Sequence, residues 1–200
     1  SYIFANTLDL GAKYDVELLA NLKINTINPD DFWDSRSANI DTWNDIDADD
    51  LSETNAELYS RSTNDDPSGS PTYGTWEPFA NSTKRGRGFQ FKVEMETSND
   101  SQDVVVQTLG VSVKLQRRTE QQRNISSGTS SSGKAVTFPS AFYSTPSITI
   151  TATNMATGDY FELSSVSRTG FTIKFLAADG TTVLNRSFDY QAVGHGKEIT

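Results

Sequence analysis

Hydrophobic side chains recur at every second position in several stretches of this 200-residue chain. In "YDVELLANLKI", apolar residues occupy every even position from Tyr14 to Ile24, with Asp15, Glu17 and Lys23 between them. A period of two places alternate side chains on opposite faces of a strand. Leu and Glu favour helices, but the periodicity outweighs this local propensity. The stretch therefore predicts a strand with one buried face.

The same alternation returns in "FQFKVEMET", residues 89–97, and in "DVVVQTLGVSVKL", residues 103–115. In the latter, Val104 and Val106 share one parity, while Val111 and Val113 share the other. A β-bulge near 107–108 would produce this switch. A shorter strand is predicted at 56–62.

The apolar pattern stops in "RRTEQQRNISSGTSSSG", residues 117–133. The charged and then Ser/Gly-rich composition indicates a linker. A short polar helix over 117–124 is the alternative for its first part. Short alternating strands follow at 134–138, 147–153, 160–166, 170–176 and 182–193, separated by Gly-containing turns.

These patterns predict an all-β protein of two antiparallel β-sandwich, jelly-roll-like lobes. The expected domains are residues 1–116, a linker at 117–133 and residues 134–200. The second lobe is small, and the chain contains no cysteine that could brace it with a disulfide. Oligomerisation is the natural support for such a domain.

The formal net charge is −9, and the acidic residues are concentrated between Asp30 and Asp66. That segment has 12 Asp and Glu against Arg36 and Arg61, a balance of −10. Nucleic acid is a poor partner for such a chain, because phosphates require a basic surface. No apolar run reaches the length of about 18 residues that a membrane helix needs, so no membrane insertion is expected.

The acidic stretch "DTWNDIDADD" places Asp45, Asp47 and Asp49 at alternate positions. Calcium prefers several oxygen ligands, so these three carboxylates are candidate metal ligands. An EF-hand is excluded, since its required Gly and Glu positions hold Asp50 and Ala56. A solvated acidic loop without a cation is the alternative, and no other cofactor is expected.

No catalytic residue is predicted. His195 is the only histidine, and it stands five residues from the end of the sequence without a G-x-S-x-G motif elsewhere. Paired carboxylates are too numerous to single out a hydrolytic pair. The chain is therefore not expected to be an enzyme.

The first half resembles a sandwich domain of tail-tip and host-specificity proteins of tailed phages. The resemblance is carried in order by "TLDLGAKYDVELLANL", "FWDSRSANIDTW", "AELYSRSTNDDPSGSPTYGTWEPF" and "GFQFKVEMETSNDSQDVVVQTLGVSV". It implies a location in the virion tail, outside the cell, and a role in adsorption.

The second half resembles the H-type lectin domain, through "VTFPSAFYSTPSITITAT", "SSVSRTGFTIKF" and "SFDYQAVG". The resemblance implies a six-stranded antiparallel sandwich that assembles as a homotrimer. It also implies binding of N-acetylgalactosamine-type sugars at loops near the protomer interfaces.

Together these features predict a receptor-binding or tail-tip protein that attaches the virion to a host-surface glycan or protein, alongside other tail proteins. A purely structural tail-tip or trimerisation module is the alternative, and a depolymerase is a third. Polar and aromatic residues in turn-rich stretches are the candidate ligand contacts: Asp159, Tyr160, Asp179, Trp43 and Tyr73.

Overall fold

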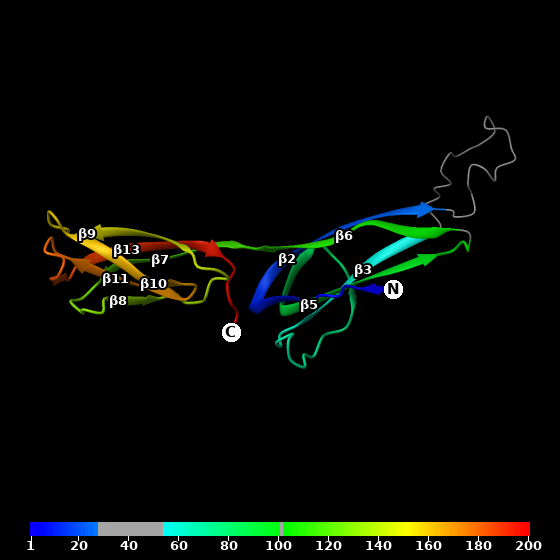
Figure 1. The fold of residues 1–200 in the computed structure, drawn as a ribbon, viewed down its shortest axis with the longest axis horizontal. Coiled ribbons are helices and arrows are strands. Elements are labelled where there is room, and N and C mark those ends of the chain that lie inside the picture. Colours follow the sequence, from blue (N-terminus) through cyan, green and yellow to red (C-terminus); the bar gives the residue numbers. More distant parts are fainter. Residues whose placement is uncertain (28–53, 101) are drawn as a thin grey trace, which may run out of the picture. The chain divides into compact units, whose positions relative to one another are not determined.

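The computed structural model describes residues 1–27, 54–100 and 102–200, and within them the protein is all-β, with three antiparallel sheets and no helix (Figure 1). The chain divides into two compact units. The first comprises Ser1–Lys13 and Glu17–Lys114, and the second comprises Tyr14–Val16 and Leu115–Thr200. No helix that could span a membrane occurs in the described ranges.

The first unit is built on one six-stranded sheet in the order β4-β3-β5-β2-β6, with β1 paired to β5. Its strands are β1 (Tyr2–Ile3), β2 (Leu8–Ile27), β3 (Thr54–Thr63), β4 (Glu77–Pro78), β5 (Ser82–Thr97) and β6 (Asp103–Leu115). The expected second sheet of a sandwich is not present among the described residues of this unit.

The alternation predicted in β5 is confirmed from Phe89 through Phe91 to Val93, which are buried, but not for Met95, which is 38% exposed. In the antiparallel register of β3 and β5, Leu58 lies opposite Val93, so both strands direct apolar side chains to the same face. The polar residues that alternate with these apolar ones form the opposite face of the sheet. The loop after β3 packs on that face.

In β6 the switch of parity is also present. Gln107 and Thr108 are both exposed, whereas Val104 and Val106 before them and Leu109 after them are partly buried. When the buried side chains of a strand change from one face of the sheet to the other, two successive residues are exposed at the switch.

The second unit contains a four-stranded and a three-stranded sheet. In the first, β11 (Gly170–Leu176) pairs along one edge with β10 (Tyr160–Ser167) and along the other with β8 (Lys134–Thr137) and β12 (Val183–Leu184). In the second, β13 (Ser187–His195) lies between β7 (Arg117–Ser126) and β9 (Ser147–Thr153).

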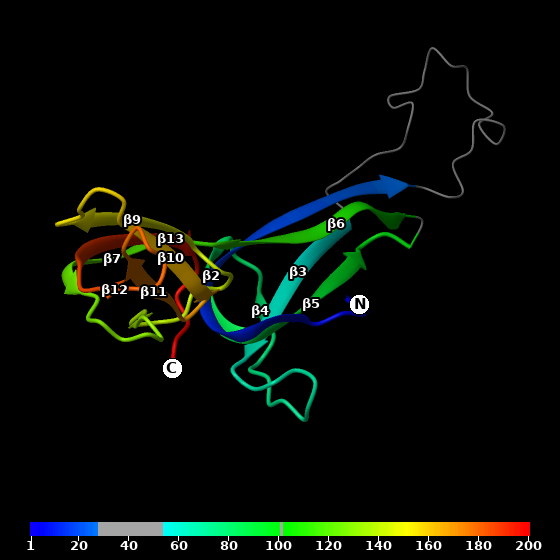
Figure 2. The same ribbon diagram turned by 60° about the vertical axis from the view of Figure 1, so that its left-hand side comes forward.

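Figure 2 shows the strands of these two sheets. Side chains from both sheets form one buried cluster in this unit. Phe175 of β11 and Phe188 of β13 are fully buried, with ring centroids 5.9 Å apart. The alternation predicted for β11 is confirmed, since Phe171, Ile173 and Phe175 are buried. Burying three such side chains contributes several kcal/mol of hydrophobic free energy, at about 1.5–3 kcal/mol each.

The segment predicted as a linker or a short polar helix is different in the structure. Arg117–Ser126 is strand β7, paired antiparallel with β13 from His195↔Arg117 to Ser187↔Ser126. An edge strand needs few apolar residues, and of β7 only Ile125 is buried. The interpretation of 117–133 as a linker is therefore wrong for its first ten residues.

Candidate functional site

Three of the predicted contact residues lie on two turns of the second unit. Asp159 ends the turn between β9 and β10, Tyr160 follows it as the first residue of β10, and Asp179 lies in the turn between β11 and β12. The turns are in contact, because a Cβ on Gly158 would lie 2.8 Å from the Cβ of Ala178. The structure thus brings together residues that the sequence separates by twenty positions.

One oxygen of the Asp159 carboxylate is held by three donors of its own chain. Oδ2 accepts hydrogen bonds from the Ala156 amide at 2.9 Å and from Arg186, with Nε at 2.9 Å and Nη2 at 2.6 Å. The Ala156 amide, followed by the Arg186 guanidinium, holds the pKa of Asp159 below its usual value. Only 6% of this side chain is exposed. Asp159 therefore fixes a turn and offers little to a ligand.

Asp179 has a similar role in the neighbouring turn. Its carboxylate accepts hydrogen bonds from the Thr182 hydroxyl at 2.6 Å and from the amides of Thr182 and Thr181 at 2.8 and 2.9 Å. These donors, the Thr182 hydroxyl first, lower the pKa of Asp179 to about 2. Of the three predicted residues on these turns, Tyr160 alone presents a large exposed side chain, at 40%.

Tyr73 belongs to the first unit, where it packs on the side of the β3–β5 pair that carries polar residues. The guanidinium of Arg61 lies 4.8 Å from the Tyr73 ring centroid and 4.5 Å from that of Trp76. The Arg61 Nε also donates to Gln90 at 2.8 Å. Tyr73 and Trp76 thus fasten the loop between β3 and β4 to the sheet through cation–π contacts.

The remaining predicted residues lie outside the described residues: the aromatic Trp43 and the candidate calcium ligands Asp45, Asp47 and Asp49. Within the described ranges, no group of three or more His, Cys, Asp or Glu side chains could hold a metal ion.

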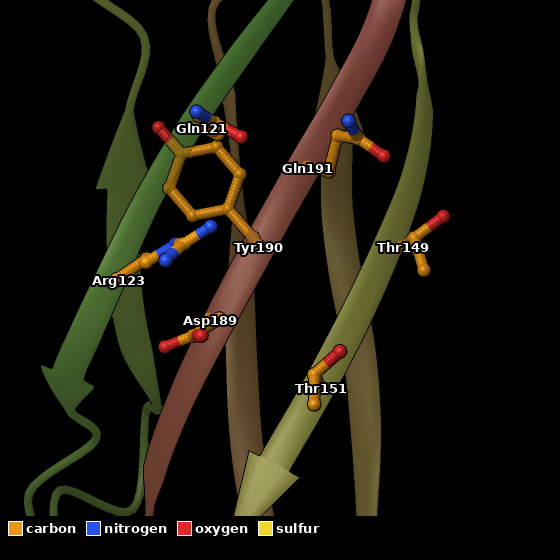
Figure 3. Close-up of a pocket in the computed structure, with 7 residues that line it drawn as sticks. All are labelled: Gln121, Arg123, Thr149, Thr151, Asp189, Tyr190 and Gln191. Atoms are coloured by element: carbon orange, nitrogen blue, oxygen red, sulfur yellow. The ribbon is translucent and has the colours of Figure 1, made fainter.

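The sequence reasoning did not foresee a polar surface on the β7–β13–β9 sheet. In one row across the three strands, Gln191 of β13 lies opposite Gln121 of β7 and Thr149 of β9. In the next row, Asp189 lies opposite Thr151. We call the side chains of these two rows, with Arg123, the polar face. Together with Tyr190 they line a cavity of about 240 Å³ (Figure 3).

The β13 side chains of the polar face point outward because the residues that alternate with them are buried in the core. Phe188, Tyr190 and Ala192 are buried, so Asp189 and Gln191 between them point away from the core. A register shift between Phe188 and Tyr190 in the β13–β7 pair adds a residue to β7 next to Asp189. The backbone N–H of Asn124, a residue with φ of 56°, donates there to Asp189 Oδ1 at 2.7 Å.

Chemically, the polar face offers two carboxamides, two hydroxyls, a carboxylate and a guanidinium. Neutral amides and hydroxyls both donate and accept hydrogen bonds, while the charged pair adds one strong acceptor and one strong donor. This is a set for recognising a ligand rich in hydroxyl groups. The alternation of Thr149 and Thr151 was visible in the sequence, but Gln121 and Arg123 of the same face lie in the segment that was interpreted as a linker.

Comparisons with known proteins do not identify a relative: no family model matches the chain, and no curated protein or solved structure is significantly similar to it.

Proposed function

We propose that this chain is a non-enzymatic attachment protein of a tailed-phage virion, a receptor-binding or tail-tip component that contacts a glycan or protein on the host surface. The two sequence resemblances support the phage and lectin parts of this proposal. The observation that carries the binding role is the polar face, where neutral donors and acceptors from three strands border one cavity.

A β-sandwich of the H-type lectin kind is the inferred architecture of the second unit. In support, the residues that carry the resemblance are structural: Phe138, Phe171 and Tyr190 are buried in the cluster between its two sheets. Their rings are close together, with the Phe138 and Phe171 centroids 6.0 and 5.3 Å from that of Tyr190. These three residues therefore act in packing, and a ligand would bind at the surface.

A glycan suits the polar face better than a folded protein does. Specific protein–protein interfaces centre on buried aromatic or Arg anchors. The one arginine of the polar face, Arg123, is exposed, and the other side chains are two carboxamides, two hydroxyls and a carboxylate around a cavity of about 240 Å³. A single site of this kind binds weakly, and a homotrimer displaying three of them gains avidity by raising the effective concentration at the surface.

A purely structural tail-tip or trimerisation module is the second candidate. It is favoured by the internal hydrogen bonding of Asp159 and Asp179, because both carboxylates already hold their own turns. In that case recognition would reside in another tail protein.

Adsorption separates the two candidates. Purified chain is incubated with a panel of bacterial strains, and bound protein is measured together with the block of phage adsorption. The attachment protein binds the susceptible strains and competes with the virion. If the chain forms a stable oligomer but binds none of the bacterial strains, the structural candidate is supported instead.

A further inference from the structure

The sheet surface that holds the polar face continues along β7 toward the start of that strand. From Gln121 to Arg117 the register of β7 with β13 is unbroken, and Arg117 lies opposite His195. Residues two apart on a strand share a face, so Arg117 lies on the same face as Gln121, about 13 Å further along the strand. The Arg117 side chain is exposed. The surface beside the polar face therefore leads to a positive charge.

A second cavity, of about 200 Å³, lies at this end of β7. Its lining includes Arg117 and Arg118 of β7, Lys197 just after β13, and Asp15 of β2, all of which belong to the second unit. We call Arg117, Arg118 and Lys197 the basic cluster. Three cations around one cavity repel one another, so a nearby anion is favourable there.

The segment after β13 is held beside β7 by backbone hydrogen bonds. The N–H of Gly196 donates to the Gln116 carbonyl at 2.9 Å, and the N–H of Glu198 donates to the Ala141 carbonyl at 3.0 Å. The Glu198 carboxylate pairs with Arg168, with Oε2 2.9 Å from Nη2, so its charge is already balanced. Lys197 stands between these two anchored residues and is exposed.

Arg118 is a positive charge that packing fixes in place. Its side chain is 13% exposed, its guanidinium carbon lies 3.9 Å from the Phe142 ring centroid, and Nη2 donates to the Ser140 carbonyl at 2.5 Å. Glu120 Oε1 lies 3.3 Å from Nη1, but among the described residues neither Nη1 nor Nε has a hydrogen-bond partner. Burial holds the pKa of Arg118 below its usual value. The protein thus compensates this charge only in part.

We propose that the basic cluster binds a carboxylate, and that the ligand of the attachment site is therefore an acidic oligosaccharide. Against its three positive charges stand the carboxylates of Asp15 and Glu120, so one positive charge remains. A singly charged carboxylate matches this balance better than a phosphate monoester, which carries nearly two charges. Arg117 and Lys197 are the exposed donors, and a guanidinium can give a carboxylate two parallel hydrogen bonds.

The inference rests on the proposed function, because the polar face supplies the neutral part of the site. One sugar ring cannot reach from Gln121 to Arg117, whereas a chain of several sugars along β7 can contact both. An acidic peptide also carries carboxylates, but it has few hydroxyl groups for the polar face. Two contact regions on one ligand strengthen each other, since binding at the first raises the effective concentration at the second.

The test is calorimetric titration of the whole chain with hexamers of glucuronic, galacturonic and sialic acid, each beside its carboxyl-reduced, neutral form. The variants are Arg117→Gln and Lys197→Gln. The matched control is Lys134→Gln, which removes the same charge from an exposed residue of β8 that lines neither cavity. We expect the native chain and Lys134→Gln to bind at least one acidic hexamer about tenfold more tightly than its neutral form.

Arg117→Gln and Lys197→Gln should each lose most of this preference and keep the native affinity for the neutral hexamer, a pattern that misfolding would not produce. Variants that keep the full preference, or a native chain that binds both forms equally or binds neither, would overturn the carboxylate site. A glutamate hexapeptide that binds as tightly as the acidic sugar would overturn the glycan assignment. Binding of the neutral forms alone would leave the polar face standing, so the two failures are distinguishable.

Discussion

Arg186 donates two hydrogen bonds to one carboxylate oxygen of Asp159, from Nε at 2.9 Å and from Nη2 at 2.6 Å. The pair joins the turn before β10 to the segment between β12 and β13. Its two residues are separated by 27 positions in the sequence. Asp159 is thereby a structural residue, although its position in a polar turn made it a candidate for ligand binding. The Asp159 side chain is only 6% exposed. Removing Arg186 would leave this shielded carboxylate without the positive charge beside it.

Replacing Arg186 with Met should lower the thermal midpoint of the second unit, because a shielded carboxylate loses its ion pair. Lys174→Met removes the same charge from a pair whose Glu162 side chain is 53% exposed, so it should have a several-fold smaller effect. Circular dichroism melting of the two variants checks this. Equal shifts would show that the Asp159–Arg186 pair stabilises no more than a surface pair.

The acid response of the second unit should depend on Asp179. Its folded pKa of about 2 is below the ordinary 3.8, so its carboxylate contributes stability that is complete above about pH 4. That contribution is lost as the pH falls through about 2, where the folded carboxyl takes up its proton. We expect Asp179→Ala to be less stable than the native chain near pH 5 and the difference to shrink toward pH 2, as measured by thermal unfolding. A difference that grows on acidification would contradict this sign.

Gly170 has no room for a side chain. A Cβ there would overlap the Val136 carbonyl oxygen, because β8 and β11 pair at this point. Gly170→Ala should cost about 2 kcal/mol or more of unfolding free energy by forcing the strands apart. The control is Gly110→Ala in β6, where a Cβ meets nothing within 4 Å, and this change should stay within about 1 kcal/mol. Denaturant unfolding of both variants gives the comparison, and a neutral Gly170→Ala would refute the close approach.

In the first unit, Arg61 and Trp76 should be energetically coupled. Their cation–π geometry, at 4.5 Å, predicts a coupling of about 0.5–1 kcal/mol in a double-mutant cycle of Arg61→Gln and Trp76→Leu. Unfolding of the native chain, the two single variants and the double variant provides the cycle. Additive effects would mean that the loop between β3 and β4 is held by other contacts.

Much of the strand structure was predictable, because a period of two is a direct consequence of having one buried face. Phe89, Phe91 and Val93, and likewise Phe171, Ile173 and Phe175, are buried as their spacing predicts. The same logic failed for β7, where the sequence has no apolar alternation. An edge strand can gain most of its stabilisation from the backbone ladder with β13, which leaves its side chains polar and its sequence similar to that of a linker.

The candidate site was less predictable, for two physical reasons. Asp in a turn hydrogen-bonds to nearby backbone amides as readily as to a ligand, and composition does not distinguish the two uses of Asp179. The polar face, moreover, depends on strand register. Gln121, Thr149 and Gln191 are far apart in the chain and become neighbours only when β7 and β9 pair on either side of β13.

Binding of the native chain to an array of host-type glycans, compared with the Thr149→Ala/Gln191→Ala variant and with Ser147→Ala, tests the central claim most directly. Ser147 is exposed on β9 and does not line the cavity, so it controls for a small change on the same strand. We expect the native chain and Ser147→Ala to bind the same glycans and the double variant to lose at least tenfold in affinity. A double variant that binds as tightly as the native chain, or a native chain that binds no glycan, would contradict the polar face as the attachment site.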